Sequence, residues 1–228
     1  MPFQPHLVII YHAYNDLKAI RPNLTFKPDY SHIHTRPYGY HDKPHLIIRR
    51  LNRMMFYVRI RNNYRQYQET LALHQDLFPT AGQRDRLDTV MPEALQAFKQ
   101  HIRLLTAIAH AEGARVVLSS FATLHDPSLD YTKEHNLQAL SRQQKRELRL
   151  LMHFTPGLTL SAIFEGLRQY NRALREIAET EQTGWVDNAT LMPHEDAYFV
   201  DRVHFSKQGA QRLAANMLPA VLEALSKD

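Results

Sequence analysis

The chain has 228 residues, 44% of them apolar and 22% charged, which suits a single globular domain with a full core. It contains no cysteine, so disulfides, thiolate metal sites and a cysteine nucleophile are excluded. Its formal net charge of +5 permits contact with an anionic surface but does not require it. No apolar run approaches the ~20 residues of a transmembrane helix, and the seven glycines form neither a dinucleotide-binding nor a Walker motif.

The first part of the chain predicts one strand and a long insertion. Residues 7–11 are a continuous apolar run, which is typical of a strand buried on both faces of a parallel sheet. The polar residues 12–16 then stand at the carboxyl end of that strand, where open α/β sheets bind ligands. We interpret 21–91 as an insertion that contains a helix over 46–78, with an apolar stripe opposite a row of arginines.

The rest of the chain alternates helices with two further strands. Pro92 opens a helix whose apolar residues recur at helical spacing up to Gly113, a residue that suits the C-cap. A second buried strand is predicted over 114–121. Residues 122–160 are interpreted as a second insertion with a helix over 138–152. The remaining predicted elements are a helix over 161–181, a short strand over 185–187 and a helix over 206–225 that Ser206 would cap.

This order of elements predicts the fold class. Strands that alternate with helices indicate an α/β domain with a parallel sheet and helices on both sides of it. Three strands are fewer than the ~4–6 of a usual sheet. The first strand also begins almost at residue 1. We therefore expect residues 1–228 to form one α/β domain that lacks the first strands of its fold.

Residues 201–206 read Asp-Arg-Val-His-Phe-Ser and stand in a predicted loop before the last helix. Asp201 can accept a hydrogen bond from one ring nitrogen of His204. That bond would fix the tautomer of the ring and leave the other nitrogen free to take a proton from a nucleophile. The spacing therefore predicts an acid–base pair, which normally serves a serine.

Two segments of the chain resemble the GDSL-type, or SGNH, hydrolase family. In that family a strand is followed by Gly-x-Asn-Asp, and here the first strand is followed by Ala-Tyr-Asn-Asp at 13–16. The family's last segment is Asp-x-x-His before the C-terminal helix, and residues 201–204 match it. The resemblance runs from Leu7 to Leu225. It implies a three-layer α/β/α, flavodoxin-like sheet of five parallel strands, of which this chain would hold the last three.

The resemblance also implies roles for three residues. Asn15 would donate its side-chain amide to the oxyanion of a tetrahedral intermediate, a contribution that can reach ~3 kcal/mol. His204 would act as general base and then as general acid, and Asp201 would orient it. The implied activity is hydrolysis of a small-molecule or acylated ester, with no cofactor and no metal ion.

The chain departs from the family in one decisive respect. The Gly-Asp-Ser segment that carries the nucleophile is absent, as is the family's second segment, and both are expected before residue 1. The serines that could replace the nucleophile are Ser119, Ser120, Ser161 and Ser206. None stands in a Gly-x-Ser-x-Gly or Gly-Asp-Ser setting, and roles at strand ends and helix caps explain them better.

Other patterns have simpler explanations than a site. Asn15 and Asp16, taken alone, are a common turn pair after a strand. His32, His34, His41 and His45 are loosely spaced and lack a clear carboxylate partner for a metal. The arginine-rich stretch 49–65 could contact phosphates or an anionic membrane, but a solvated helix face is the usual explanation, and no nucleic-acid partner is expected.

Two hypotheses of different classes remain open. The first is the C-terminal portion of an SGNH-type serine ester hydrolase whose nucleophile lies upstream of residue 1. The second is a non-catalytic binding protein on a degenerate hydrolase fold. An edge strand left unpaired at 7–11 would also favour association with other chains. The acyl group, the leaving group and the compartment are left open by the sequence.

Overall fold

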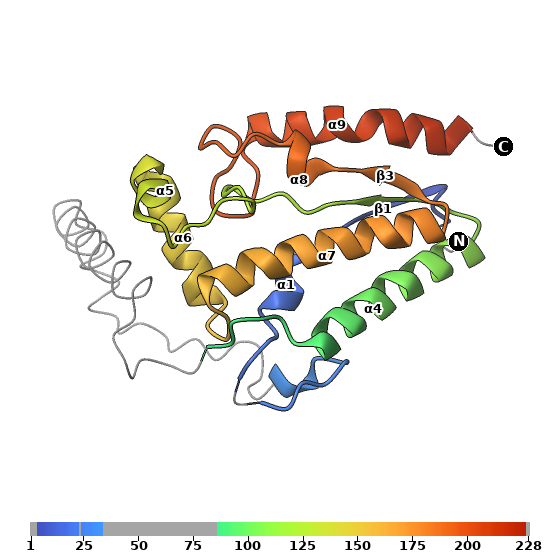
Figure 1. Ribbon diagram of the computed structural model, residues 1–228. Helices are drawn as coiled ribbons and strands as arrows, with labels where there is room; N and C mark the ends of the chain where they lie inside the picture. Colours follow the sequence, from blue (N-terminus) through green and yellow to red (C-terminus); the bar gives the residue numbers. More distant parts are fainter. Residues whose placement is uncertain (1–3, 23, 34–85, 227–228) are drawn as a thin grey trace, which may run out of the picture.

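A computed structural model describes residues 4–22, 24–33 and 86–226 of the chain (Figure 1). Its strands are β1 (Leu7–Tyr11), β2 (Arg115–Ser119) and β3 (Gly184–Val186). Its longer helices are α4 (Pro92–Ala111), α6 (Arg142–Phe154), α7 (Leu160–Thr180) and α9 (Lys207–Ser226). Its shorter helices are α1 (Tyr14–Leu17), the 3-10 helix η1 (Ser31–Ile33), α5 (Glu134–Ala139) and α8 (Asn188–Leu191). The helix predicted over 46–78 and the arginine-rich stretch 49–65 lie outside the described residues.

The three strands form one parallel sheet in the order β1-β2-β3. In β1 and β2, Leu7 lies opposite Arg115 and Tyr11 opposite Ser119. Because the last residues of neighbouring strands are paired, the segments that follow the strands begin at the same edge of the sheet. The predicted α/β class with a parallel sheet is therefore confirmed.

Helices cover both faces of the sheet (Figure 1). Alternate residues of each strand point to opposite faces. On one face, the side chains of Ile10, Val116 and Leu118 join the larger core with α4 and α7. On the other face, Val117 and Val186 pack with Met217 and Ala224 of α9. The sheet is thus the middle of three layers.

Helix α7 shows why the apolar spacing of the sequence produces this packing. Its buried side chains recur at helical intervals on one face, and Ile163, Leu174 and Ile177 are among those that are fully buried. Thr159 caps the helix, because its hydroxyl accepts a hydrogen bond from the backbone N–H of Ala162. Helix α4 begins at Pro92 as predicted, and Gly113 follows its end with a positive φ of 79°, which glycine adopts without strain.

Strand β1 differs from the prediction that it is buried on both faces. It pairs with β2 alone among the described residues, so its other edge is unpaired there. Ile10 is buried, but the side chain of Ile9 on the α9 face is 46% exposed. The physical reason is that α9 lies mainly over β2 and β3 and covers little of β1.

The segment 122–160, interpreted from sequence as an insertion, packs into the main core. The helix predicted over 138–152 is observed as α6, which begins about one turn later, at Arg142. A separate helix, α5, precedes it. Leu148, Leu151 and Leu158 have no exposed surface and belong to the same cluster as the helices that cover the sheet. This segment therefore contributes to the hydrophobic core of the domain.

Candidate functional site

Asp201 and His204 form a hydrogen-bonded pair in the loop before α9. Oδ1 of Asp201 accepts hydrogen bonds from the backbone N–H groups of Val203 and His204, each at 2.9 Å. Oδ2 of Asp201 accepts a third from Nδ1 of His204 at 2.7 Å. A carboxylate only accepts hydrogen bonds, so the proton of the neutral ring is on Nδ1. The other nitrogen, Nε2, is then a proton acceptor without a hydrogen-bond partner among the described residues, on a side chain that is 72% exposed.

The same contacts set the charge of Asp201. Burial alone raises the pKa of this carboxyl group. The backbone N–H groups of Val203 and His204 and the ring of His204 favour the charged form, and together they hold the pKa of Asp201 below its ordinary value. Asp201 is therefore a carboxylate at neutral pH and can stabilise a protonated imidazole beside it.

The loop that carries this pair is closed on itself. Phe199 and Phe205 form an antiparallel bridge, and the N–H of Val200 donates to the carbonyl of His204 at 2.9 Å. The N–H of Ser206 donates to the carbonyl of Tyr198 at 3.0 Å, and the hydroxyl of Ser206 accepts from the N–H of Gly209 at 3.1 Å. These local bonds fix the loop to the first turn of α9.

Arg202, between the two members of the pair, points inward and anchors the loop to α6. Its backbone N–H donates to Oε2 of Glu147 at 3.2 Å, and its guanidinium lies 3.7 Å from the same oxygen. The guanidinium also lies 4.4 Å from the ring centre of Phe154. Burial raises the pKa of Glu147, while the backbone N–H and the guanidinium charge of Arg202 act in the opposite direction. Both side chains are nearly buried, so each neutralises the other in the core.

Further hydrogen bonds connect the first turn of α6 to the chain before the pair. Ser141 donates its hydroxyl to Asp196 at 2.6 Å, and the Gln144 side chain donates to the carbonyl of His194 at 3.0 Å. The Gln143 side chain donates to the carbonyl of Phe199 at 3.2 Å. Through these contacts α6 supports the whole loop.

Asn15 lies at the same end of the domain as this loop. The sequence predicts it at a strand end, and the structure places it in the single helical turn α1, with an exposed side chain. Its neighbour Tyr14 accepts a hydrogen bond from Nε of Arg202 at 3.4 Å. The ring centre of Tyr14 also lies 4.6 Å from Nζ of Lys18. The charges of Arg202 and Asp201 act electrostatically on this lysine. The structure thus brings Asn15 and the Asp201–His204 pair to one edge of the sheet.

Three of the four candidate serines have structural roles, and the fourth, Ser161, is exposed in the first turn of α7. Every serine of the sequence lies among the described residues. Ser119 accepts a hydrogen bond from Asn188 in the core, and Ser120 donates to Asp187. Ser206 donates to the carbonyl of Ala197 and caps α9. None has a hydrogen bond to His204.

Sequence reasoning missed a second His–Asp pair near the end of β1. His12 contacts Asp16 through Nε2, and Tyr30 donates its hydroxyl to the other oxygen of Asp16, which is 5% exposed. The hydrogen bond to Asp16 raises the pKa of His12, and burial opposes it. The spacing of four residues between His12 and Asp16 could have predicted this contact. Residues at that spacing meet only on a helical turn, however, and the sequence predicted none here.

Of the histidines considered as metal ligands, only His32 lies among the described residues. Its Nε2 donates to the carbonyl of Ala19 at 2.8 Å, and its Nδ1 accepts from the N–H of Lys27 at 3.2 Å. Both nitrogens are therefore used in holding the chain after α1. His34, His41 and His45 lie outside the described part of the chain, within which no cluster of three metal-ligating side chains occurs.

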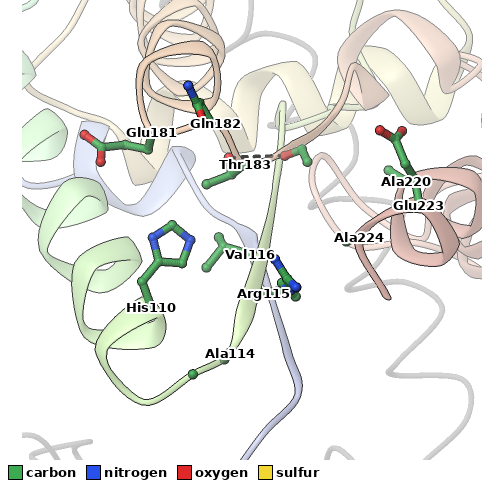
Figure 2. A pocket seen from close by; sticks show the side chains of 12 residues that line it. His110, Ala114, Arg115, Val116, Glu181, Gln182, Thr183, Ala220, Glu223 and Ala224 are labelled. Carbon is green, nitrogen blue, oxygen red and sulfur yellow. Dashed lines mark hydrogen bonds between the residues drawn. The ribbon is translucent and has the colours of Figure 1, made fainter. Parts of the chain in front are cut away.

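A polar pocket of about 530 Å³ lies at the opposite end of the sheet (Figure 2). Its walls come from the amino ends of β2 and β3, the end of α4, the turn after α7 and the last turns of α9. His110, Arg115 and Glu181 are among its polar residues, as Figure 2 shows. Neither Asn15 nor the Asp201–His204 pair contributes to it.

Comparison of the chain with protein-family models, with curated proteins and with solved structures finds no match in any of the three. Within residues 4–22, 24–33 and 86–226, no helix is both long enough and apolar enough to cross a bilayer.

Proposed function

We propose that this domain carries the acid–base pair and an oxyanion donor of an SGNH-type serine ester hydrolase. The observation that carries the proposal is the 2.7 Å hydrogen bond from Nδ1 of His204 to Asp201, which leaves Nε2 of the neutral ring free to accept a proton on a largely exposed side chain. This geometry suits a general base. The placement of Asn15 at the same edge of the parallel sheet supports the proposal.

In the proposed reaction, Nε2 of His204 removes the proton from a serine hydroxyl while the oxygen attacks the ester carbonyl. Asp201 remains a carboxylate and stabilises the imidazolium. The amide of Asn15 donates to the oxygen on which negative charge develops. His204 then returns the proton to the leaving alcohol, and a water molecule repeats the cycle to release the acid.

In this proposal the nucleophile lies in a segment other than the described residues, because no serine among them has a hydrogen bond to His204. We place it on a strand–loop unit that pairs with the edge of β1 opposite β2. The exposed side chain of Ile9 supports this position, as does the absence of a partner for this edge among the described residues. A loop that follows such a strand would start at the edge of the sheet where Asn15 and His204 lie.

The test uses the native gene product, treated with a fluorophosphonate. This reagent phosphonylates activated serines with loss of fluoride. We expect labelling of one serine, located by mass spectrometry, and a loss of at least about 10⁴-fold in labelling rate for His204→Ala. His110→Ala, an exposed histidine at the other end of the sheet, is the matched control. No labelling, or labelling that His204→Ala leaves unchanged, contradicts the proposal.

The second candidate is a binding protein without catalysis. The structural roles of Ser119, Ser120 and Ser206 favour it, since no hydroxyl among the described residues is bonded to His204. In that case the native gene product resists the fluorophosphonate. It also hydrolyses p-nitrophenyl acetate no faster than its His204→Ala variant.

A further inference from the structure

Lys18 makes a direct contact with the proposed oxyanion donor. Its Nζ donates a hydrogen bond to Oδ1 of Asn15 at 3.0 Å. Lys18 follows Asn15 by three residues, immediately after the single turn α1, so the two side chains lie on one side of that turn.

This contact determines which way the amide of Asn15 faces. The oxygen and nitrogen of an asparagine side chain have nearly the same shape, and their assignment depends on their partners. A lysine ammonium has only donors, so the atom beside it must be the amide oxygen. The NH₂ group is then directed away from Lys18, and an oxyanion requires that donor.

Lys18 is itself held in place by its neighbours. Its Nζ lies 4.6 Å from the ring centre of Tyr14, which is buried. The charged groups facing it are Arg202 and Asp201 from the loop before α9. Burial lowers the pKa of Lys18 from its ordinary value, Arg202 acts in the same direction, and Asp201 opposes both. No carboxylate within the described ranges forms an ion pair with Lys18.

We propose that Lys18 is a positioning residue that fixes the amide of Asn15 with its NH₂ group toward the reacting ester. The importance of this role for catalysis rests on the proposed function. The bond also draws electrons from the amide oxygen, which makes the NH₂ group a better donor to an oxyanion. An asparagine on an exposed single turn would otherwise rotate freely between its two amide orientations.

Nuclear magnetic resonance of the labelled protein tests the orientation without any need for activity. As the pH rises, we expect the Asn15 carbonyl carbon and the Lys18 side-chain carbon beside Nζ to shift with one common midpoint, below 10.5, the ordinary lysine value. In Lys18→Met the Asn15 step disappears. Tyr14→Phe retains it, which excludes the phenol as its source. An Asn15 carbon that does not respond as Lys18 titrates overturns the proposal.

Kinetics of the native gene product test the catalytic consequence. Lys18→Met lowers kcat about tenfold with KM little changed, as for other residues that orient a reacting group. Asn15→Ala has the larger effect, and the double variant loses no more than Asn15→Ala alone. Lys99→Met, which removes an ion pair between α4 and α7, is the control. Equal kcat values for Lys18→Met and the parent refute the catalytic role. A parent without esterase activity refutes the proposed function, and the resonance experiment still decides the orientation.

Discussion

Replacement of Asp201 by asparagine changes one hydrogen bond and leaves two in place. The side-chain oxygen of asparagine can still accept from the N–H groups of Val203 and His204, as Oδ1 does now at 2.9 Å. The new NH₂ group takes the place of Oδ2, which accepts from His204 at 2.7 Å. Because NH₂ donates, Nδ1 of His204 must become the acceptor and the ring proton must move to Nε2.

The expected cost in stability follows from this count. A charge-assisted hydrogen bond contributes about 1.5–3 kcal/mol when water is excluded. His204 is 72% exposed, so water competes for the bond and the loss in Asp201→Asn should be about 1 kcal/mol. For a chain of this size that lowers Tm by about 3 °C. Asp201→Ala loses all three bonds and should cost about 2–3 kcal/mol.

The tautomer is read from the ring nitrogens of His204 by long-range proton–nitrogen correlation at about pH 9, where histidine is ordinarily neutral. We expect a protonated Nδ1 in the parent and a protonated Nε2 in Asp201→Asn. Any serine-dependent esterase activity of the native gene product should fall by about 10⁴-fold, because Nε2 can no longer accept a proton. A proton that stays on Nδ1 in Asp201→Asn would falsify the assigned geometry.

Three other substitutions test the surroundings of the site. Gly209→Ala places a Cβ atom 1.9 Å from the carbonyl oxygen of Tyr198, and the strain together with a weakened loop bond should cost about 2–4 kcal/mol in urea unfolding. His12→Asn removes the imidazole partner of Asp16 and leaves the hydrogen bond from Tyr30 in place. The contact with Asp16 raises the pKa of His12, so it stabilises the fold fully below about pH 6.5, the ordinary histidine value, and no longer does so once the pH exceeds the raised pKa. His12→Asn should therefore lower the free energy of unfolding by roughly 1 kcal/mol at pH 6, and this loss should shrink by pH 9. Ile9→Lys should reduce association through the edge of β1, measured by light scattering.

Each of these has a matched control. The control for Gly209→Ala is Gln208→Ala, at an exposed neighbouring position. The control for His12→Asn is His110→Asn, at an exposed histidine on α4. The control for Ile9→Lys is Val200→Lys, at another exposed apolar side chain. Gly209→Ala as stable as the parent would show that Tyr198 can move away. A pH-independent effect of His12→Asn would contradict the ion pair. Equal association of Ile9→Lys and the parent would show that the edge is not the surface involved.

The regular elements were predictable where a local pattern is long enough. The apolar runs at 7–11 and 114–121 and the helical spacing after Pro92 each extend over several residues, and each produced the expected element. Helices α1 and α8 have four residues each, too few for any periodicity, and neither was predicted. The exposure of Ile9 was also missed, because it depends on which helix covers the edge of the sheet.

The same distinction holds for the site. Asp201 and His204 are three residues apart in a loop, so their contact could be predicted from sequence alone. The contact of Arg202 with Glu147 joins residues 55 positions apart and depends on how α6 packs. The role of Lys18 depends on the helical turn that brings it beside Asn15, and that turn was not predicted.

The contacts of α6 have a consequence for engineering. Loop exchange between related proteins treats a segment such as 122–160 as a replaceable module. Here its residues hold the chain from His194 to Arg202 by side-chain hydrogen bonds and an ion pair. A graft that changed this segment would misplace His204 even with every residue of the 201–204 motif retained. A chimera that replaces this segment must therefore keep the first turn of α6 together with Glu147.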